Sequence, residues 1–301
     1  MRTALLHLDD ALGGQETLCA RVAATGGCAL DLRDLGPALR LWARPDALDR
    51  LASRLDAGLP DGPLLAVSGS GDFHHVTALL LARACEQASD DVTVVHFDNH
   101  PDWVRFGRGL HCGSWVARAA RTPGVAKVVT VGVCSRDIRA PQARRADPEL
   151  IAGGRLEVYA YPEPPAGAQP TFADRWPAIA AVGEAAFAAL LPGRIKTAAV
   201  YVTIDKDVLR PQDAATNWDQ GRLPLEALET LVRAACDGRR LAGADVVGDW
   251  SRPAYGGGPA AMLKRGEAWM DQPRARPGPQ AIAGNQATNL RLIDLIERLA
   301  P

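Results

Sequence analysis

The sequence predicts one α/β domain over residues 1–301, with three layers: a mostly parallel, about eight-stranded sheet between two layers of helices. Eight segments rich in apolar and β-branched residues recur along the chain, and amphipathic or Ala/Leu-rich segments separate several of them. The strand segments are nearly continuous in apolar residues, which is typical of parallel strands buried on both faces. With 47% hydrophobic residues, a chain of this length can bury the core of such a domain.

The expected elements alternate along the chain. The expected strands cover residues 2–9, 28–34, 63–70, 91–98, 126–133, 155–161, 197–205 and 241–250. The expected helices cover residues 44–59, 75–89, 176–191 and 224–236. Two Pro- and Gly-rich stretches, 161–170 and 252–281, are expected to be surface loops, because these residues favour turns.

The composition excludes several classes of partner. With 34 basic and 35 acidic residues, the net charge of −1 provides no global field to attract nucleic acid or an anionic membrane. The N-terminal residues lack the apolar core of a signal peptide, and no apolar run reaches the ~18 residues of a membrane span. The six cysteines show no C-x-x-C spacing. We therefore expect a cytoplasmic protein with reduced cysteines and a small-molecule partner.

Three of the expected strand ends carry ligand-type side chains, and ligands bind beyond the carboxyl ends of parallel strands. In "VVHFDNHPDW", residues 94–103, and in "VYVTIDKDV", residues 200–208, these side chains alternate and share one side of an extended chain. In "AVSGSGDFHHVT", residues 66–77, a Gly/Ser turn leads into an expected helix. If the three ends converge, the pocket holds His74, Asp98, His100, Asp102, Asp205 and Asp207.

The charge of such a pocket indicates metal ions. Four unpaired carboxylates in a desolvated site would raise one another's pKa values and become protonated. Two divalent cations balance the four negative charges, at the ~3.5–4 Å separation of two-metal sites. Oxygen-rich ligation with some imidazole favours Mn(II), with Co, Ni or Zn as substitutes. A hydroxide that bridges two such ions would attack a planar electrophilic carbon, which is metal-assisted hydrolysis.

These motifs resemble those of the ureohydrolase family, which includes arginase, agmatinase and formiminoglutamase. The resemblance rests on "DNHPD", "TIDKD" and, in altered form, "GSGDFHH", and it covers roughly residues 64 to 252. It implies an arginase-like α/β/α fold, usually with eight parallel strands, two Mn(II) ions per subunit and assembly into homo-oligomers.

The resemblance also implies roles for individual residues. One metal would be bound by His74, Asp98, Asp102 and Asp205, and the other by His100, Asp98, Asp205 and Asp207. His74 is preferred to His75 because, with His74 as the ligand, the helix that follows has the same phase as in the family. His75 stays open as the alternative ligand. The segment "LHCGSWVARA" resembles a family His-Gly pair, which implicates His111 in proton transfer, and His111 and Asp102 are the expected catalytic residues.

The sequence departs from the family motifs at positions that are expected to contact the substrate. Gly248 stands where the family has a glutamate that pairs with the substrate guanidinium, so Asp249 is the expected substitute. The short loop after Asp102 carries Arg105 and Arg108, which we expect to bind a substrate carboxylate and which favour a guanidino acid over agmatine.

The expected function is hydrolysis of a guanidino or amidine-like compound to urea and an amine. Two alternatives stay open: a formimino or amide C–N hydrolase, including mononuclear zinc deacetylases of related fold, and a non-catalytic metal-binding protein. His96 shares the side of the strand that carries Asp98, but it lies inside the strand and is expected to be structural.

Overall fold

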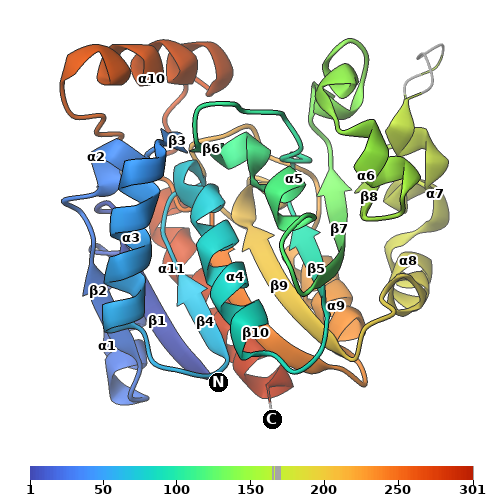
Figure 1. The fold of residues 1–301 in the computed structure, drawn as a ribbon, viewed down its shortest axis with the longest axis horizontal. Helices are drawn as coiled ribbons and strands as arrows, with labels where there is room; N and C mark the ends of the chain where they lie inside the picture. The colour runs from blue at the N-terminus through green and yellow to red at the C-terminus, as the bar shows by residue number, and fades with distance from the viewer. Residues whose placement is uncertain (165, 167–170, 301) are drawn as a thin grey trace.

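The eight expected strands form one parallel sheet in the computed structural model, which describes residues 1–164, 166 and 171–300. The strand order is β2-β1-β4-β10-β9-β5-β7-β8, and helices cover both faces (Figure 1). This is the predicted three-layer α/β/α architecture. The strands are β1 (Arg2–His7), β2 (Cys28–Asp31), β4 (Leu64–Val67), β5 (Val92–Phe97), β7 (Val125–Val133), β8 (Leu156–Ala160), β9 (Ala199–Asp205) and β10 (Arg240–Val247). β3 (Trp42–Ala43) and β6 (Leu110–His111) form a small antiparallel pair.

The described helices include the four that were expected. They are α1 (Glu16–Ala24), α2 (Gly36–Leu39), α3 (Pro45–Gly58), α4 (Thr77–Gln87), α5 (Trp115–Ala119), α6 (Pro148–Ala152), α7 (Ile179–Val182), α8 (Glu184–Leu190), α9 (Leu225–Cys236), α10 (Gly258–Asp271) and α11 (Pro279–Leu299). The helix expected over residues 176–191 is divided by Gly183, whose φ of 85° is outside the helical region.

One expected loop is wrong. α10, Gly258–Asp271, lies within residues 252–281, and α11 begins within them. The proline in α10 lies in its first turn, where a missing backbone N–H costs nothing, so it begins the helix instead of breaking it. In the other expected loop, 161–170, residues 165 and 167–170 lie outside the described residues.

Each face of the sheet has its own hydrophobic core. Side chains of α3, α4 and α5 pack on one face, and those of α1, α8, α9 and α11 pack on the other. In Figure 1, α3, α4 and α5 lie in front of the sheet, while α9 and α11 lie behind it. Burial on both faces explains why the central strands read as continuous apolar runs.

The carboxyl ends of the central strands meet at one edge of the sheet, and α10 lies above α2 and β3 in Figure 1. β5 and β9 are neighbours, and Phe97 pairs with Ile204, so the residues that follow, Asp98 and Asp205, leave the sheet side by side. Within the described chain, no helix combines the length and apolar character that a bilayer span requires.

Candidate metal centre

The three polar strand ends converge on a cavity of about 720 Å³. The segment after β4 forms a 3-10 helix, Gly71–Val76, which carries His74 into the cavity, and the ends of β5 and β9 supply the carboxylates. All six expected ligands line this cavity: His74, Asp98, His100, Asp102, Asp205 and Asp207.

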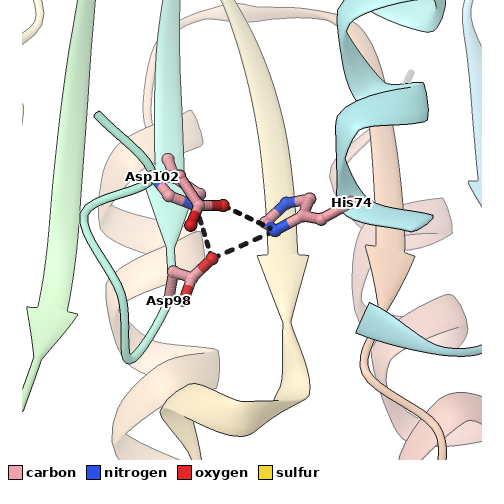
Figure 2. Close-up of side chains that lie close together, drawn as sticks. His74, Asp98 and Asp102 are labelled. Carbon is pink, nitrogen blue, oxygen red and sulfur yellow. Dashed lines mark hydrogen bonds and ion pairs between the residues drawn. The ribbon is translucent and has the colours of Figure 1, made fainter. Parts of the chain in front are cut away.

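His74 lies at the centre of the first cluster. Its Nδ1 is 3.0 Å from Asp98 Oδ2, 3.3 Å from Asp102 Oδ2 and 3.5 Å from Asp205 Oδ2, and Figure 2 marks the first two contacts. Nδ1 nevertheless has no hydrogen-bond partner among the described residues. A buried imidazole nitrogen that faces three carboxylate oxygens indicates that a cation belongs between them.

The other ring nitrogen of His74 is held by a chain of hydrogen bonds. Nε2 is 3.0 Å from Thr203 Oγ1, and Thr203 Oγ1 donates its proton to Asp245 Oδ1. Because the single hydroxyl proton of Thr203 is already used, Nε2 must be the donor to Thr203. The lone pair of His74 therefore lies on Nδ1, where a metal ligand needs it.

His100 belongs to a second cluster that shares Asp98 with the first. Its Nδ1 is 2.9 Å from Asp207 Oδ2 and 3.5 Å from Asp98 Oδ1, and its Nε2 is 2.9 Å from Asp219 Oδ1. Asp98 thus presents Oδ2 to the first cluster and Oδ1 to the second. This is the arrangement in which one carboxylate can bridge two ions.

Local backbone conformation and close packing fix the carboxylates of Asp102 and Asp205. Asp102 has a φ of 47°, which is unusual outside glycine, and its Oδ2 accepts a hydrogen bond of 2.8 Å from Trp115 Nε1. Asp205 lies between two glycines: a Cβ at Gly71 would be 2.5 Å from its Oδ2, and a Cβ at Gly248 would be 2.4 Å from its Oδ1. No side chain fits at Gly248, which explains why a glutamate is absent there.

The pKa shifts show the electrostatic cost of the cluster. Burial and the charge of Asp98 raise the pKa of Asp102 and that of Asp205 to about 6, and burial and Asp205 raise the pKa of Asp207 well above its usual value. Burial alone would lower the pKa of His74, but the carboxylates of Asp102 and Asp98 raise it well above its usual value. The cluster therefore attracts positive charge, which divalent cations can supply.

The structure places His74, not His75, in the cluster. His75 does not line the cavity, it is fully buried, and neither of its ring nitrogens has a hydrogen-bond partner among the described residues. Burial lowers its pKa well below the usual value, so its ring is neutral at physiological pH.

His111 lines the cavity beside the cluster. Its Nδ1 accepts a hydrogen bond of 2.8 Å from the backbone N–H of Gly113, and its Nε2 contacts Glu267 of α10. Since Nδ1 accepts, Nε2 carries the proton and donates it to the Glu267 carboxylate. The histidine is thus in hydrogen-bond contact with an acid that lies 156 positions away in sequence.

Asp249 does not reach the cavity, which corrects its expected role. Its carboxylate accepts hydrogen bonds from the fully buried Lys206 and from Asn289 Nδ2 of α11. Asp249 therefore forms a buried ion pair with Lys206 outside the cavity lining.

Arg105 and Arg108 also lie outside the cavity lining, and both are exposed. Val104 and Phe106 line the cavity instead, and Arg105 between them points to the other side, because alternate residues of an extended segment face opposite ways. Arg108 lies in the bend at residues 107–109. Two other arginines, Arg136 and Arg145, line it from the segment after β7, and neither has an ion-pair partner within the described part of the chain.

Sequence reasoning missed five residues of the site. They are His96, Arg136, Arg145, Asp219 and Glu267. The end of β7 at "CSRD" is a fourth polar strand end, and its inspection would have found Arg136. Glu267 was assigned to a loop, and Asp219 lies in a loop without any periodic signal.

Comparisons with known proteins agree with this fold. Residues 15–151 match the model of the arginase family. An uncharacterized protein from Thermotoga maritima is 28% identical over 182 residues, which cover 60% of this chain and 56% of that protein. The match therefore spans little more than half of that relative's length.

Several solved structures share the fold. Arginase from Bacillus cereus matches with a TM-score of 0.57 and 13% identity over 97% of each chain. Formimidoylglutamase from Bacillus subtilis matches with a TM-score of 0.56 and 12% identity, over 100% of this chain and 87% of that chain. A hypothetical agmatinase from Burkholderia thailandensis matches with a TM-score of 0.54 and 16% identity, over 98% and 86%. The family match covers residues 15–151, and the solved structures show that the chain has the arginase-like α/β fold.

Proposed function

We propose that the chain is a metal-dependent hydrolase that cleaves a C–N bond of a guanidino compound and releases urea and an amine. The observation that carries the proposal is the pair of His/Asp clusters that share Asp98. The match of residues 15–151 to the arginase family supports the same reaction class. We propose two Mn(II) ions per subunit, with Co, Ni or Zn as possible substitutes.

The donor set favours two divalent cations. His74, Asp98, Asp102 and Asp205 would hold one ion, and His100, Asp98, Asp205 and Asp207 the other. When bound, such ions supply Lewis-acid chemistry and activate water at neutral pH.

We propose that His111 and Glu267 handle the proton that the leaving amine needs. Cleavage of the C–N bond leaves an amine nitrogen that must be protonated. Nε2–H of His111 already points at Glu267, so the pair can pass a proton between the cavity and the rim. Asp102 orders this region, because its backbone carbonyl accepts a hydrogen bond of 3.1 Å from Val116 N, at the start of α5.

The cavity rim supports a substrate with a carboxylate. Arg136 and Arg145 line the cavity from the segment after β7, and Glu267 and Asp271 line it from α10. Two guanidinium groups without ion-pair partners favour a carboxylate in their reach. We therefore propose a guanidino acid as the substrate class, with Arg136 and Arg145 in the role first expected of Arg105 and Arg108.

The proposal is tested by urea release from a panel of guanidino acids and guanidino amines, with protein loaded with Mn(II). Asp205→Ala removes a carboxylate that both clusters need and should abolish the release. Asp46→Ala, which removes an exposed carboxylate on α3, is the control and should leave it unchanged. Equal urea release by wild type and Asp205→Ala would refute the shared-ligand assignment.

The same panel distinguishes the alternatives. Release of formamide or ammonia from a formimino or amide compound, without urea, would indicate a related C–N hydrolase. A doubly metallated protein that binds these compounds and converts none of them would be a metal-binding protein.

Two further expectations stay proposals. We propose a homo-oligomer in which the exposed apolar side chains of α10, Met262, Leu263, Trp269 and Met270, contact a second copy. Trp269→Glu should then lower the mass measured by light scattering, whereas Val182→Glu, at a separate exposed apolar side chain, should not.

The six cysteines are free thiols, which agrees with the expected reduced state, and a cytoplasmic location stays a prediction.

A further inference from the structure

β5 carries a third imidazole directly beneath the metal centre. His96 lies two residues before Asp98, so the two side chains share one face of the strand, and His96 is fully buried. Its Nε2 is 2.8 Å from Asp98 Oδ2 and 4.0 Å from Asp102 Oδ2. Its ring is also the neighbour of the His74 ring, with the two centroids 5.1 Å apart. The motifs that carry the family resemblance assign His96 no role.

We propose that His96 is a ligand of the first metal ion through Nε2, so that this ion has two imidazoles beside the carboxylates of Asp98 and Asp102, with Asp205 shared with the second ion. The inference rests on the metal centre of the proposed function and does not depend on its substrate. The four donor atoms lie within 4.8 Å of one another. Ligand atoms around an ion bound at ~2.0–2.2 Å in a tetrahedral site are ~3.3–3.6 Å apart. The measured separations that involve His74 and His96, from 2.8 to 4.0 Å, bracket this range.

The far side of the His96 ring is supported as a metal ligand requires. Nδ1 lies 3.1 Å from Thr130 Oγ1 on β7, and this hydroxyl makes no other hydrogen bond among the described residues. The hydroxyl can accept Nδ1–H when Nε2 binds an ion, or donate to Nδ1 when Nε2 carries the proton. The ring is satisfied in both states and need not move when metal binds.

His96 and His74 have equivalent supports within one row of the sheet. His96 pairs in register with Thr130 on β7 and with Thr203 on β9. Thr203 accepts the Nε2 proton of His74, as Thr130 can accept the Nδ1 proton of His96. Each threonine therefore orients one imidazole toward the same pair of carboxylates.

The two metal positions then differ chemically. The first has two nitrogen donors, whereas the second has only His100 among its oxygen donors. Imidazole-rich sites suit zinc and cobalt, and oxygen-rich sites suit manganese. The first position should therefore hold zinc or cobalt more tightly than the second does.

The test counts coordinated imidazoles by proton NMR of protein stripped with a chelator and loaded with Co(II). Each coordinated histidine has one ring N–H whose solvent-exchangeable signal is shifted by the ion. We expect three such signals, from His74, His96 and His100. His96→Gln should remove one of the three, whereas His75→Gln, at a buried histidine outside the cluster, should keep all three. Only two signals in the wild type, or no loss in His96→Gln, would overturn the proposal.

A second measurement needs no variant. In wild-type protein labelled with ¹⁵N-histidine, Zn(II) should shift one ring nitrogen of each of three histidines, and a shift in only two would count against His96. These readouts are independent of turnover. Urea release by a protein with two coordinated imidazoles would reject His96 and leave the hydrolase proposal standing. Three coordinated imidazoles without urea release would support His96 and reject the ureohydrolase reaction.

Discussion

Nε2 of His100 lies 2.9 Å from Asp219 Oδ1, on the side of the ring opposite the metal centre. Asp219 accepts this hydrogen bond as a carboxylate. The hydrogen bonds from His100 and from Asn99 Nδ2, which is 3.2 Å from the other oxygen, hold the pKa of Asp219 below its usual value against the effect of burial. Nε2 is therefore the donor, and the lone pair on Nδ1 faces Asp207 and Asp98. A loop residue thus sets the tautomer of a ligand that comes from β5.

Removal of this support should weaken one metal position. We expect Asp219→Ala to lower the affinity of the second position by ~10–100-fold, as is typical when the partner of a ligating histidine is lost. Titration with Mn(II) should show one weakened and one unchanged site. Asp271→Ala, at a cavity acid that makes no contact with His100, is the control, and equal weakening in both variants would contradict the role of Asp219.

Metal should stabilise the protein more at pH 7.5 than at pH 5. The pKa values of Asp102 and Asp205 are about 6 in the folded, metal-free protein, above the ordinary value of 3.8. Between pH 3.8 and about pH 6, the folded state therefore binds more protons than the unfolded state. The free energy of unfolding of the metal-free protein falls as the pH rises through this range. Metal binds the deprotonated carboxylates, so its benefit is greatest above pH 6. The rise in Tm on addition of Mn(II), measured at both pH values, checks this; an equal rise would contradict it.

Loss of either cavity arginine should weaken the binding of an acidic substrate. A charge-assisted hydrogen bond contributes ~1.5–3 kcal/mol, so Arg136→Ala or Arg145→Ala should raise KM by ~10–100-fold. The kcat should change less, because these residues lie at the rim. Arg105→Ala, at an exposed arginine outside the cavity, should leave KM unchanged. Unchanged KM in both cavity variants would reject the carboxylate subsite.

Asp249→Ala should act on stability and leave substrate binding intact. The variant leaves the fully buried Lys206 without its carboxylate, which costs ~3–5 kcal/mol in a buried pair. Denaturant unfolding should show this loss, and the double variant Lys206→Met/Asp249→Leu should recover much of it. A raised KM in folded Asp249→Ala protein, with no loss of stability, would restore the substrate role first expected.

Gly248→Ala should displace a metal ligand. Both Gly248 and Gly238 have positive φ, 97° and 66°, so an alanine at either position costs ~1–2 kcal/mol of backbone strain. Only at Gly248 would the new Cβ meet a carboxylate, 2.4 Å from Asp205 Oδ1, whereas no atom lies within 4 Å at Gly238. We expect both variants to lose stability and Gly248→Ala alone to lose metal. Equal metal content in the two proteins, measured by elemental analysis, would show that Asp205 tolerates the contact.

Local patterns predicted most of the fold. The strand segments are apolar because both faces of the sheet are covered, and this burial is visible in the sequence of each strand by itself. α10 was missed because only Ala261 and Lys264 of its residues are buried, so its apolar side chains do not follow the pattern of a core-facing helix.

The sequence by itself determined the fold class and the six converging ligand-type residues, because period-2 alternation at a strand end is a local property of the chain. Only the tertiary structure decided which other charged residues join them. Asp249 turns away because Lys206 and Asn289 of α11 bind it, and Arg136 lines the cavity because β7 lies beside β5 in the sheet. Thr130 supports the His96 ring because β7 lies beside β5. Each of these outcomes depends on contacts between segments that are distant in sequence, and such contacts leave no local pattern.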